Sequence, residues 1–417
     1  MPTEYPPAPQ DPHDHREAHA SLAAGLFTNG VWDMLSIVVP LYAVAVGLSV
    51  SEIGFIVAAR SVLPTALSIH GGILMDRWGT RRVLTRLAIA SIVLPLVYPA
   101  SGWFVTLIVL QLILGLASSL GMAAAQTWSL QSSHGDTAML ARFSIYSRIG
   151  TFIGPVMVGA IWDFFGAWPA FACISLWAAG VLGSSAYGAP ARSRDRDTSP
   201  GSRARALGAL LPRWSEHKDA LALAAIPAVA FILAISFLRN SPGAIQASFY
   251  VVYLGEVGLS GTMIGTLVGL SEFFGVLGSL VAAPMERLVS ARRLLIACIL
   301  SSIAAIAVTP LIGHVLALLF VASAVRGVGQ GLSQPLMYSI LGRAVPPAMH
   351  GATVGLRNSV TRLASIITPA FMGIVAGVWG IEMSFYLVGG LFVVATLALG
   401  FVAGAILRER RAVPRPR

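Results

Sequence analysis

The chain is poor in charged residues. Asp, Glu, Lys and Arg make up only 11% of its 417 residues, whereas soluble proteins carry about 25%. Its mean hydropathy is +0.77. These values exclude a soluble globular enzyme as well as the disordered and fibrous classes. The hydrophobic share of 56% is enough for about a dozen helices of the roughly 20 apolar residues that cross a bilayer.

Lysine and cysteine are scarce. Lys218 is the only lysine, so arginines supply almost all of the basic side chains behind the net charge of +10. In an apolar chain such an excess usually marks cytoplasmic loops, and we expect no nucleic-acid partner. Cys173 and Cys298 lie far apart in separate apolar runs. Their spacing predicts neither a metal cluster nor a disulfide.

Motifs of catalysis and cofactor binding are also missing. The sequence contains no Walker-type phosphate loop, no CxxC pair and no convincing Ser/His/Asp constellation. His13, His15 and His19 lie near Asp11 and Asp14, but such a polar terminal segment is typical of a solvated tail rather than of a metal site. We therefore expect no cofactor, no metal and no enzymatic activity.

Twelve apolar segments dominate the chain, in two groups of six. Their expected boundaries are 21–46, 52–75, 83–100, 103–127, 141–165 and 168–187, then 221–253, 261–284, 294–312, 315–338, 353–378 and 383–407. This pattern predicts an all-α integral membrane fold. The expected parts are an N-terminal tail (1–20), a six-helix bundle (21–188), a polar linker (189–219), a second six-helix bundle (220–407) and a basic tail (408–417).

The distribution of arginine predicts the orientation in the membrane. Arginines concentrate in the loops after segments two, six, eight and ten and in the C-terminal tail, and the opposite loops hold essentially none. Short loops rich in Lys and Arg stay in the cytoplasm. We expect a multi-pass protein of the inner (cytoplasmic) membrane, with both termini in the cytoplasm.

The two groups of segments resemble each other in sequence. Residues 46–54 read VGLSVSEIG and residues 257–265 read VGLSGTMIG, a shift of 211 residues. Arg148 and Pro155 match Arg362 and Pro369 at a shift of 214, and Gly166 matches Gly380. Two parallel repeats of six spans are typical of one transporter architecture.

The loop after the second segment carries a specific motif. Residues 72–82 read GILMDRWGTRR, which has the form G-x-L-x-D-R-x-G-x-R-R, and a decayed copy (Glu286-Arg287, then Arg292-Arg293) follows segment eight. This motif resembles the loop signature of the major facilitator superfamily, at the position where that family carries it. The resemblance covers nearly the whole chain and implies twelve transmembrane helices in two six-helix pseudo-repeats.

The same resemblance implies a cytoplasmic latch between the two halves. Gly72 would permit close helix packing, and Gly79 a tight turn. Asp76 would face the start of segment eleven, near Gly351 to Thr353, where a helix N-terminus stabilises an anion. Arg148 and Arg362 occupy equivalent places in the repeat, which favours a shared structural role. The expected gate and latch residues are Gly72, Asp76, Arg77, Gly79, Arg81, Arg82, Arg148 and Arg362.

Two further segments resemble particular groups within this superfamily, the proton-coupled antiporters. Residues 150–159 (GTFIGPVMVG) are similar to the fifth helix of proton-coupled antiporters, with Val158 in place of one glycine. Asp33, followed by Pro40, is similar to the first helix of drug:proton antiporters. The fourth segment departs from the family, because Gln111 stands where an arginine is usual.

Only two acids lie within the central part of the apolar segments. Ionisable groups are costly there, so each needs a partner, a cavity or a function. Asp33 is the candidate proton carrier, or the counter-ion of a cationic substrate; the alternative is a structural ion pair with an arginine. Glu272 is a second proton-coupling candidate, or the partner of Arg148, although their expected depths differ by about one turn.

Polar residues on the expected pore-lining segments are candidates for the substrate cavity. Ordinary hydrogen bonds between helices, or packing for the aromatic ring, are the alternative role of each. Arg326 is the strongest of them, because the tenth segment faces the pore in the resembled family. The candidates are Asn29, Trp32, Gln126, Arg239, Asn240, Arg326 and Gln334.

These observations predict a secondary transporter that works by alternating access. Proton-coupled export of a drug or metabolite is the favoured function, with protons, a small-molecule substrate and the lipid bilayer as partners of a monomer. The alternative is a carrier of an anionic metabolite, a carboxylate or a sugar phosphate, bound by intramembrane arginines. A membrane sensor would need a larger soluble domain than this sequence contains. A membrane enzyme would need a catalytic constellation, and the sequence shows none.

The latch hypothesis predicts a phenotype for Asp76→Asn. Loss of the negative charge should shift the protein away from the state closed to the cytoplasm, because the helix terminus that it faces loses its partner. Transport and the cytoplasmic labelling of cavity cysteines should both change. Unaltered transport together with unaltered labelling would show that Asp76 is no latch.

Overall fold

The computed structural model describes residues 12–133, 137–188, 227–344 and 350–412. The first half contains a short turn, η1 (Tyr98–Ala100), and six long helices. They are α1 (Pro12–Ala45), α2 (Val50–Trp78), α3 (Thr80–Val97), α4 (Phe104–Ser132), α5 (Thr137–Phe165) and α6 (Ala167–Tyr187).

The second half is more segmented. Its elements are α9 (Pro227–Ile245), η2 (Gln246–Tyr250), α10 (Val251–Glu256), α11 (Gly261–Leu280), α12 (Ala282–Leu288), α13 (Ala291–Ala307), α14 (Thr309–Ile312), α15 (Leu316–Ala344), α16 (His350–Trp379) and α17 (Ile381–Ala412). The short helices interrupt or end longer rods, which is why the second half has more elements than spans.

Among the described residues, ten helices are long and apolar enough to cross a membrane. The helices α12 and α13 meet at a bend of 120° and would make an eleventh span if counted together. The expected number of twelve is therefore met only in part by this criterion. The seventh expected segment is the interrupted rod α9–η2–α10, and its first residues, 221–226, lie outside the described part.

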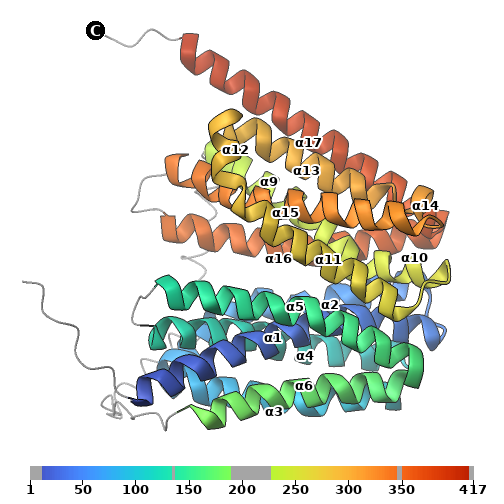
Figure 1. Cartoon of the computed structure of the whole chain (residues 1–417). Helices are drawn as coiled ribbons and strands as arrows, with labels where there is room; N and C mark the ends of the chain where they lie inside the picture. The colour runs from blue at the N-terminus through green and yellow to red at the C-terminus, as the bar shows by residue number, and fades with distance from the viewer. Residues whose placement is uncertain (1–11, 134–136, 189–226, 345–349, 413–417) are drawn as a thin grey trace, which may run out of the picture.

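The helices form two bundles that lie against each other (Figure 1). In the view of Figure 1, α1–α6 form the lower bundle and α9–α17 the upper one. The main contacts between them join α2 to α16 and α5 to α11. Because α2 and α5 correspond to α11 and α16 in the sequence repeat, the interface is pseudo-symmetric.

The backbone repeats as the sequence does. Gly47 and Gly258 have φ angles of 78° and 85°, and Gly166 and Gly380 have 80° and 84°. These angles lie in the left-handed region, which glycine adopts without steric cost. Each serves a tight connection between two helices. The serines that cap α2 and α11, Ser49 and Ser260, have nearly identical backbone angles (−66°, 154° and −67°, 154°).

We call the end of the molecule that carries these four glycine turns the closed end. It lies at the right of Figure 1, opposite the C-terminus. There the Asp163 carboxylate, at the end of α5, accepts hydrogen bonds from the backbone N–H groups of Gly261 and Thr262 at 2.6 and 2.7 Å. It also accepts one from the Thr262 hydroxyl at 2.6 Å. A side chain of one bundle thus caps the first turn of α11 in the other.

Glycine and proline bring the two bundles into close contact near the closed end. A side chain at Gly265 would collide with the carbonyl of Pro155, and one at Gly54 would meet the carbonyl of Pro369 at 2.6 Å. The two contacts are related by the repeat. Next to the second, the Ser51 hydroxyl donates to the Gly373 carbonyl at 2.9 Å. Residues 150–159 therefore do pack on the eighth segment through Pro155 and Gly159, whereas Gly150 and Gly154 face α1.

The Asp163 cap generates a prediction about the closed end. Asp163→Ala removes charge-assisted hydrogen bonds, each worth about 1.5–3 kcal/mol. We expect the closed end to open more often, by roughly tenfold or more, since 1.4 kcal/mol is a factor of ten. The reporter is Leu41→Cys, at the contact between α1 and Gly255 of α10, labelled with a membrane-impermeant maleimide.

The matched control is Glu52→Gln. Glu52 is also an acid at a helix start near the closed end, but it caps α2 through Ser49 of the same bundle. Its loss should leave labelling at Leu41→Cys unchanged. Equal labelling rates for Asp163→Ala and the unsubstituted chain would contradict a role of Asp163 in holding the bundles together.

Candidate functional site

A buried arginine, Arg60, lies on the inner side of the first bundle. It comes from α2 and is only 4% exposed. Its guanidinium lies 3.5 Å from the centroid of the Trp32 ring on α1 and donates to the Trp32 carbonyl. Its Nε–H is buried without a hydrogen-bond partner in the described structure. Trp32, a cavity candidate, therefore serves as the platform for a cation.

Asp33 follows Trp32 on α1 and is half-buried. It interacts electrostatically with Arg60 of its own bundle and with Glu272 of the other. Within the described residues, its carboxylate forms no hydrogen bond or ion pair. The expected alternative of a close ion pair with an arginine is thus not what the structure contains. The Asp33 carboxylate therefore lies near the Arg60 cation but has no hydrogen-bond or ion-pair partner among the described residues.

A second buried arginine lies in the other bundle. Arg326 on α15 is 3% exposed and donates through Nη1 to Oε1 of Gln246. The Nη2 group of Arg326 and the Nε2 group of Gln246 are buried without partners among the described residues. The Tyr250 hydroxyl lies 3.3 Å from that of Ser323. This cluster therefore contains more hydrogen-bond donors than acceptors among the described residues.

Gln246 and Tyr250 belong to η2, a single turn of π-helix. The π-helix is rare, and isolated π-turns occur frequently at functional sites. This one contacts α1 and α2 of the first bundle as well as α16. Arg60, Arg326 and Gln246 each lie ten residues from the closed end of their rods. At a rise of about 1.5 Å per residue, the two arginines lie at the same depth, roughly midway through a bilayer core of about 30 Å.

Two other arginines connect the bundles directly. Arg148 of α5 forms an ion pair with Glu272 of α11 at 3.7 Å, with both side chains 40% exposed. Arg362 of α16 donates to the Ser119 hydroxyl of α4 at 2.9 Å. The expected depths of Arg148 and Glu272 in the membrane differ by about one helical turn, and their long side chains span this difference. The repeat-equivalent arginines, Arg148 and Arg362, thus both reach from one bundle to the other.

Several cavity candidates turn out to be bound within one bundle. Arg239 donates to the Ser333 hydroxyl at 2.7 Å and to the Gln330 carbonyl at 2.9 Å. Asn240 donates to the Thr361 carbonyl and the Ser365 hydroxyl at 2.9 and 2.8 Å. These contacts fasten α9 to α15 and α16. Three other candidates have varied surroundings. Gln334 accepts a hydrogen bond from Arg239 at 3.4 Å, Asn29 donates to the Gly25 carbonyl of its own helix, and Gln126 is exposed.

The loop motif is described only in part. Gly79 has the expected turn conformation, with a φ of 84°. Gly72 has open space where a side chain would be, so no close packing is found there among the described residues, and its part in a latch stays a prediction. Arg81 donates to the carbonyls of Ser185 and Gly188 at 2.6 and 2.7 Å and so anchors the loop to the end of α6.

The other gate residues add little here. Arg77 and Arg82 are exposed. The side chain of Asp76 and those of residues 351–355 lie outside the described part, and the latch remains a prediction.

Two parts of this arrangement were not predicted from the sequence, the Asp163 cap and the π-turn, and for Gln111 only its departure from the family was noted. Asp163 was not singled out, although an acid in the last turn of its own helix is unfavourable towards the helix dipole and so points to a partner elsewhere. The π-turn has no sequence signature that we can identify. Gln111, the departure on the fourth helix, is 2% exposed, and its carbonyl oxygen has no hydrogen-bond partner among the described residues.

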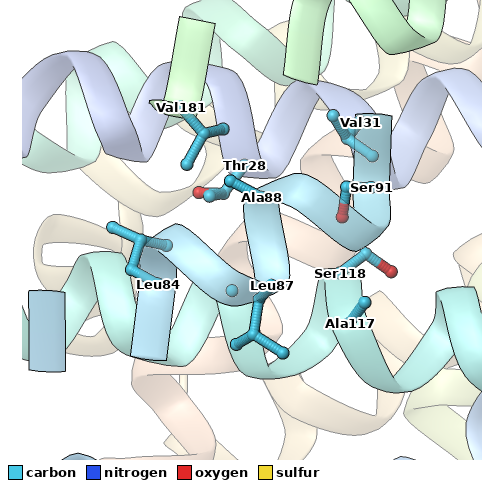
Figure 2. A pocket seen from close by; sticks show the side chains of 10 residues that line it. Thr28, Val31, Leu84, Leu87, Ala88, Ser91, Ala117, Ser118 and Val181 are labelled. Atoms are coloured by element: carbon cyan, nitrogen blue, oxygen red, sulfur yellow. The ribbon is translucent and has the colours of Figure 1, made fainter. Parts of the chain in front are cut away.

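A small pocket lies elsewhere and does not fit the role of a substrate site. It opens between α1, α3, α4 and α6 within the first bundle (Figure 2). Its polar lining groups are largely satisfied by their own helices: Thr28 donates to Ala24 and Ser118 to Leu114. In the described residues, no three His, Cys, Asp or Glu side chains gather as metal ligands would.

The chain is similar to known families and structures. The model of the Major Facilitator Superfamily matches it twice, over residues 22–251 and 232–417. Among solved structures, a mutant form of the nucleoside transporter NupG superposes with a TM-score of 0.76 at 16% identity, over 92% of this chain and 98% of that one. No protein of curated function matches the sequence.

Two further structures show the same fold. A bacterial homologue of the human lysosomal transporter Spinster, inward-facing and unoccupied, gives a TM-score of 0.72 at 14% identity, over 98% of this chain and 100% of that one. A POT family transporter in complex with 5-aminolevulinic acid gives 0.71 at 14% identity, over 92% and 95%. Identities this low support the fold alone.

The ion pair between Arg148 and Glu272 generates a prediction. Both side chains are 40% exposed. If water reaches this exposed side of the pair, it screens the two charges, and their coupling energy should stay below about 1 kcal/mol. The measurement is a double-mutant cycle with Arg148→Gln and Glu272→Gln, using thermal unfolding in detergent. A coupling of about 3 kcal/mol or more would instead identify a buried pair and contradict the exposed geometry.

Proposed function

We propose a function from one premise: the chain belongs to the major facilitator superfamily. It is a multi-pass membrane transporter of a small molecule and not an enzyme. We propose further that it couples this transport to protons and exports its substrate by alternating access of the two bundles. Asp33 would be the proton carrier.

The environment of Asp33 carries the proposal. It lies on α1 close to the level of the two buried arginines, and within the described residues its carboxylate has no hydrogen-bond or ion-pair partner. An intramembrane acid without a structural partner is a functional residue by default. Arginine remains charged in proteins, so Arg60, Arg148, Arg326 and Arg362 are unsuited to carry the proton. Glu272 is already engaged by Arg148.

Charge neutralisation at Asp33 offers a physical route to coupling. When ionised, Asp33 attracts Arg60 of its own bundle and repels Glu272 of the other bundle. Protonation removes the repulsion and so favours the conformation in which the two acids face each other. Loss of the proton on substrate binding favours the opposite conformation. A ligand or proton shifts such an equilibrium by its differential affinity for the two states.

The sidedness follows from the arginine-rich loops. If these loops are cytoplasmic, the closed end faces outward, and the contacts between the bundles there belong to a conformation that is closed to the outside. We propose the same orientation for both termini, and the inner membrane as the location. The loop with Asp76, Arg77, Arg81 and Arg82 would then form the latch when the cytoplasmic side closes. Export as the direction is supported by the similarity of residues 33–40 and 150–159 to drug:proton antiporters.

A second candidate function has its own observation. Arg326 is buried and has no carboxylate within ion-pair distance among the described residues. An anionic metabolite would supply the missing negative charge. Proton coupling through Asp33 and an anionic substrate at Arg326 are compatible, because the two groups lie in different bundles.

The proposal predicts that Asp33→Asn abolishes proton coupling. Asparagine keeps the size of the side chain and loses the exchangeable proton, so proton release on substrate addition should disappear. The measurement uses everted vesicles that contain the full chain and a pH-sensitive dye, with a panel of lipophilic cations and organic anions. Gel filtration of the purified variant checks that it folds.

The control is Asp33→Glu, which retains a carboxyl group and should keep part of the coupling. Glu272→Gln should reduce coupling less than Asp33→Asn does, since Glu272 acts through its charge on Asp33. Proton release that is undiminished in Asp33→Asn would refute the assignment of Asp33 as the carrier.

A further inference from the structure

The π-turn η2 places two polar side chains against Arg326. A regular helix would advance about 100° per residue, whereas the extra residue of a π-turn rotates the following side chains relative to the preceding ones. Gln246 and Tyr250, at its two ends, are both more than nine-tenths buried. Gln246 accepts from Arg326, and the Tyr250 hydroxyl lies by Ser323 of the same helix as Arg326.

This cluster has donors in excess. Nη2 of Arg326 and Nε2 of Gln246 are buried without partners among the described residues. A buried donor without an acceptor is unfavourable and rare in native structures. Such groups persist where a ligand or an ordered water completes them. Oε1 of Gln246 is already engaged by Nη1 of Arg326, so the open positions call for a molecule that brings acceptors.

The charges around Arg326 favour one negative charge. Among the described residues, Glu272 is the only carboxylate that interacts electrostatically with it, and Glu272 is already in an ion pair with Arg148. Asp33 is close to Arg60 in the other bundle. One positive charge is therefore left without a full counter-charge at this depth, and Glu272 opposes the approach of a dianion.

We propose that Arg326, Gln246 and Tyr250 form a carboxylate subsite, so that the transported molecule carries a carboxylate. The inference rests on the proposed function, because the subsite belongs to the same transport pathway. The guanidinium fork and the amide N–H present donors that suit the two oxygens of a planar carboxylate. Tyr250 adds a hydroxyl to the wall.

The location explains how the subsite would take part in transport. The turn η2 lies between the bundles, in contact with α1 and α2 as well as α16. Gln246, Tyr250 and Arg326 are all buried in the described conformation, and Phe249 of the same turn lies next to Gly54 of α2 in the other bundle. Movement of the bundles changes these contacts, so binding at Arg326 would depend on the conformation. That dependence is what alternating access requires.

A matched set of probes tests the proposal on the full chain purified in detergent. Benzoate, benzamide, benzyltrimethylammonium and phenyl phosphate share an aromatic body and differ in their head group. Propionate and propionamide repeat the comparison between carboxylate and amide without a ring. Thermal stability is recorded against probe concentration, because a ligand that binds the native state raises it. We expect the monoanions benzoate and propionate to stabilise the protein, and the amides and the cation to have no effect.

Variants then assign the effect to the subsite. Arg326→Lys keeps the charge and loses the fork, and should weaken carboxylate binding by roughly tenfold or more; Gln246→Ala should weaken it less. Arg239→Lys is the matched control, because Arg239 is an intramembrane arginine bound by Ser333 and Gln330. Its carboxylate affinity should remain that of the unsubstituted chain. If Arg326→Lys does not fold, carboxylate binding is compared in Gln246→Ala, Tyr250→Phe and the unsubstituted chain instead.

Three results would overturn the proposal. They are stabilisation by none of the carboxylates, equal stabilisation by the amides or the cation, and unchanged carboxylate binding in Arg326→Lys or in both Gln246→Ala and Tyr250→Phe. A stronger response to phenyl phosphate than to benzoate would replace the carboxylate by a phosphate. Asp33→Asn separates this inference from the proposed function: it should lose proton coupling and keep carboxylate binding, so either can fail alone.

Discussion

The cost of placing charge inside a bilayer governs this structure. Each embedded arginine must find acceptors within the protein, because the lipid offers none. Arg239 finds them within its own bundle, and Arg148 and Arg362 find them across the interface. Arg60 and Arg326 are buried with donors left over among the described residues. The arginines thus divide into those that hold the architecture and those whose incomplete bonding marks the centre.

Pseudo-symmetry repeats the scaffold and leaves the chemistry free to differ. Gly54 on the Pro369 carbonyl and Gly265 on the Pro155 carbonyl are one contact made twice. The side chains at the centre do not follow this rule: Arg60 corresponds to Ser271 in the repeat, and Glu272 to Ser61. Packing at the interface constrains backbone and small residues, whereas these charged positions at the centre differ between the halves.

The fold was largely predictable, and the centre was not. Apolar segments, arginine-rich loops and the repeat predicted two bundles, and the glycine turns at Gly47 and Gly258 confirm the repeat. Asn240 shows why side-chain roles are harder: a polar residue in an apolar helix signals a hydrogen bond but not its partner, and here the partner is Ser365. The pairing of Arg148 with Glu272 was disfavoured on depth, since sequence position ignores how far long side chains reach.

The sequence by itself determined that this is a membrane protein of two related halves, because hydropathy, glycine turns and the loop motif are local properties of the chain. Only the tertiary structure decided which charges satisfy one another. The π-turn that brings Gln246 to Arg326, the cap that Asp163 places on the opposite bundle, and the absence of a partner for Asp33 among the described residues all depend on contacts between distant segments. Such contacts arise from the way helices pack, which no local pattern encodes.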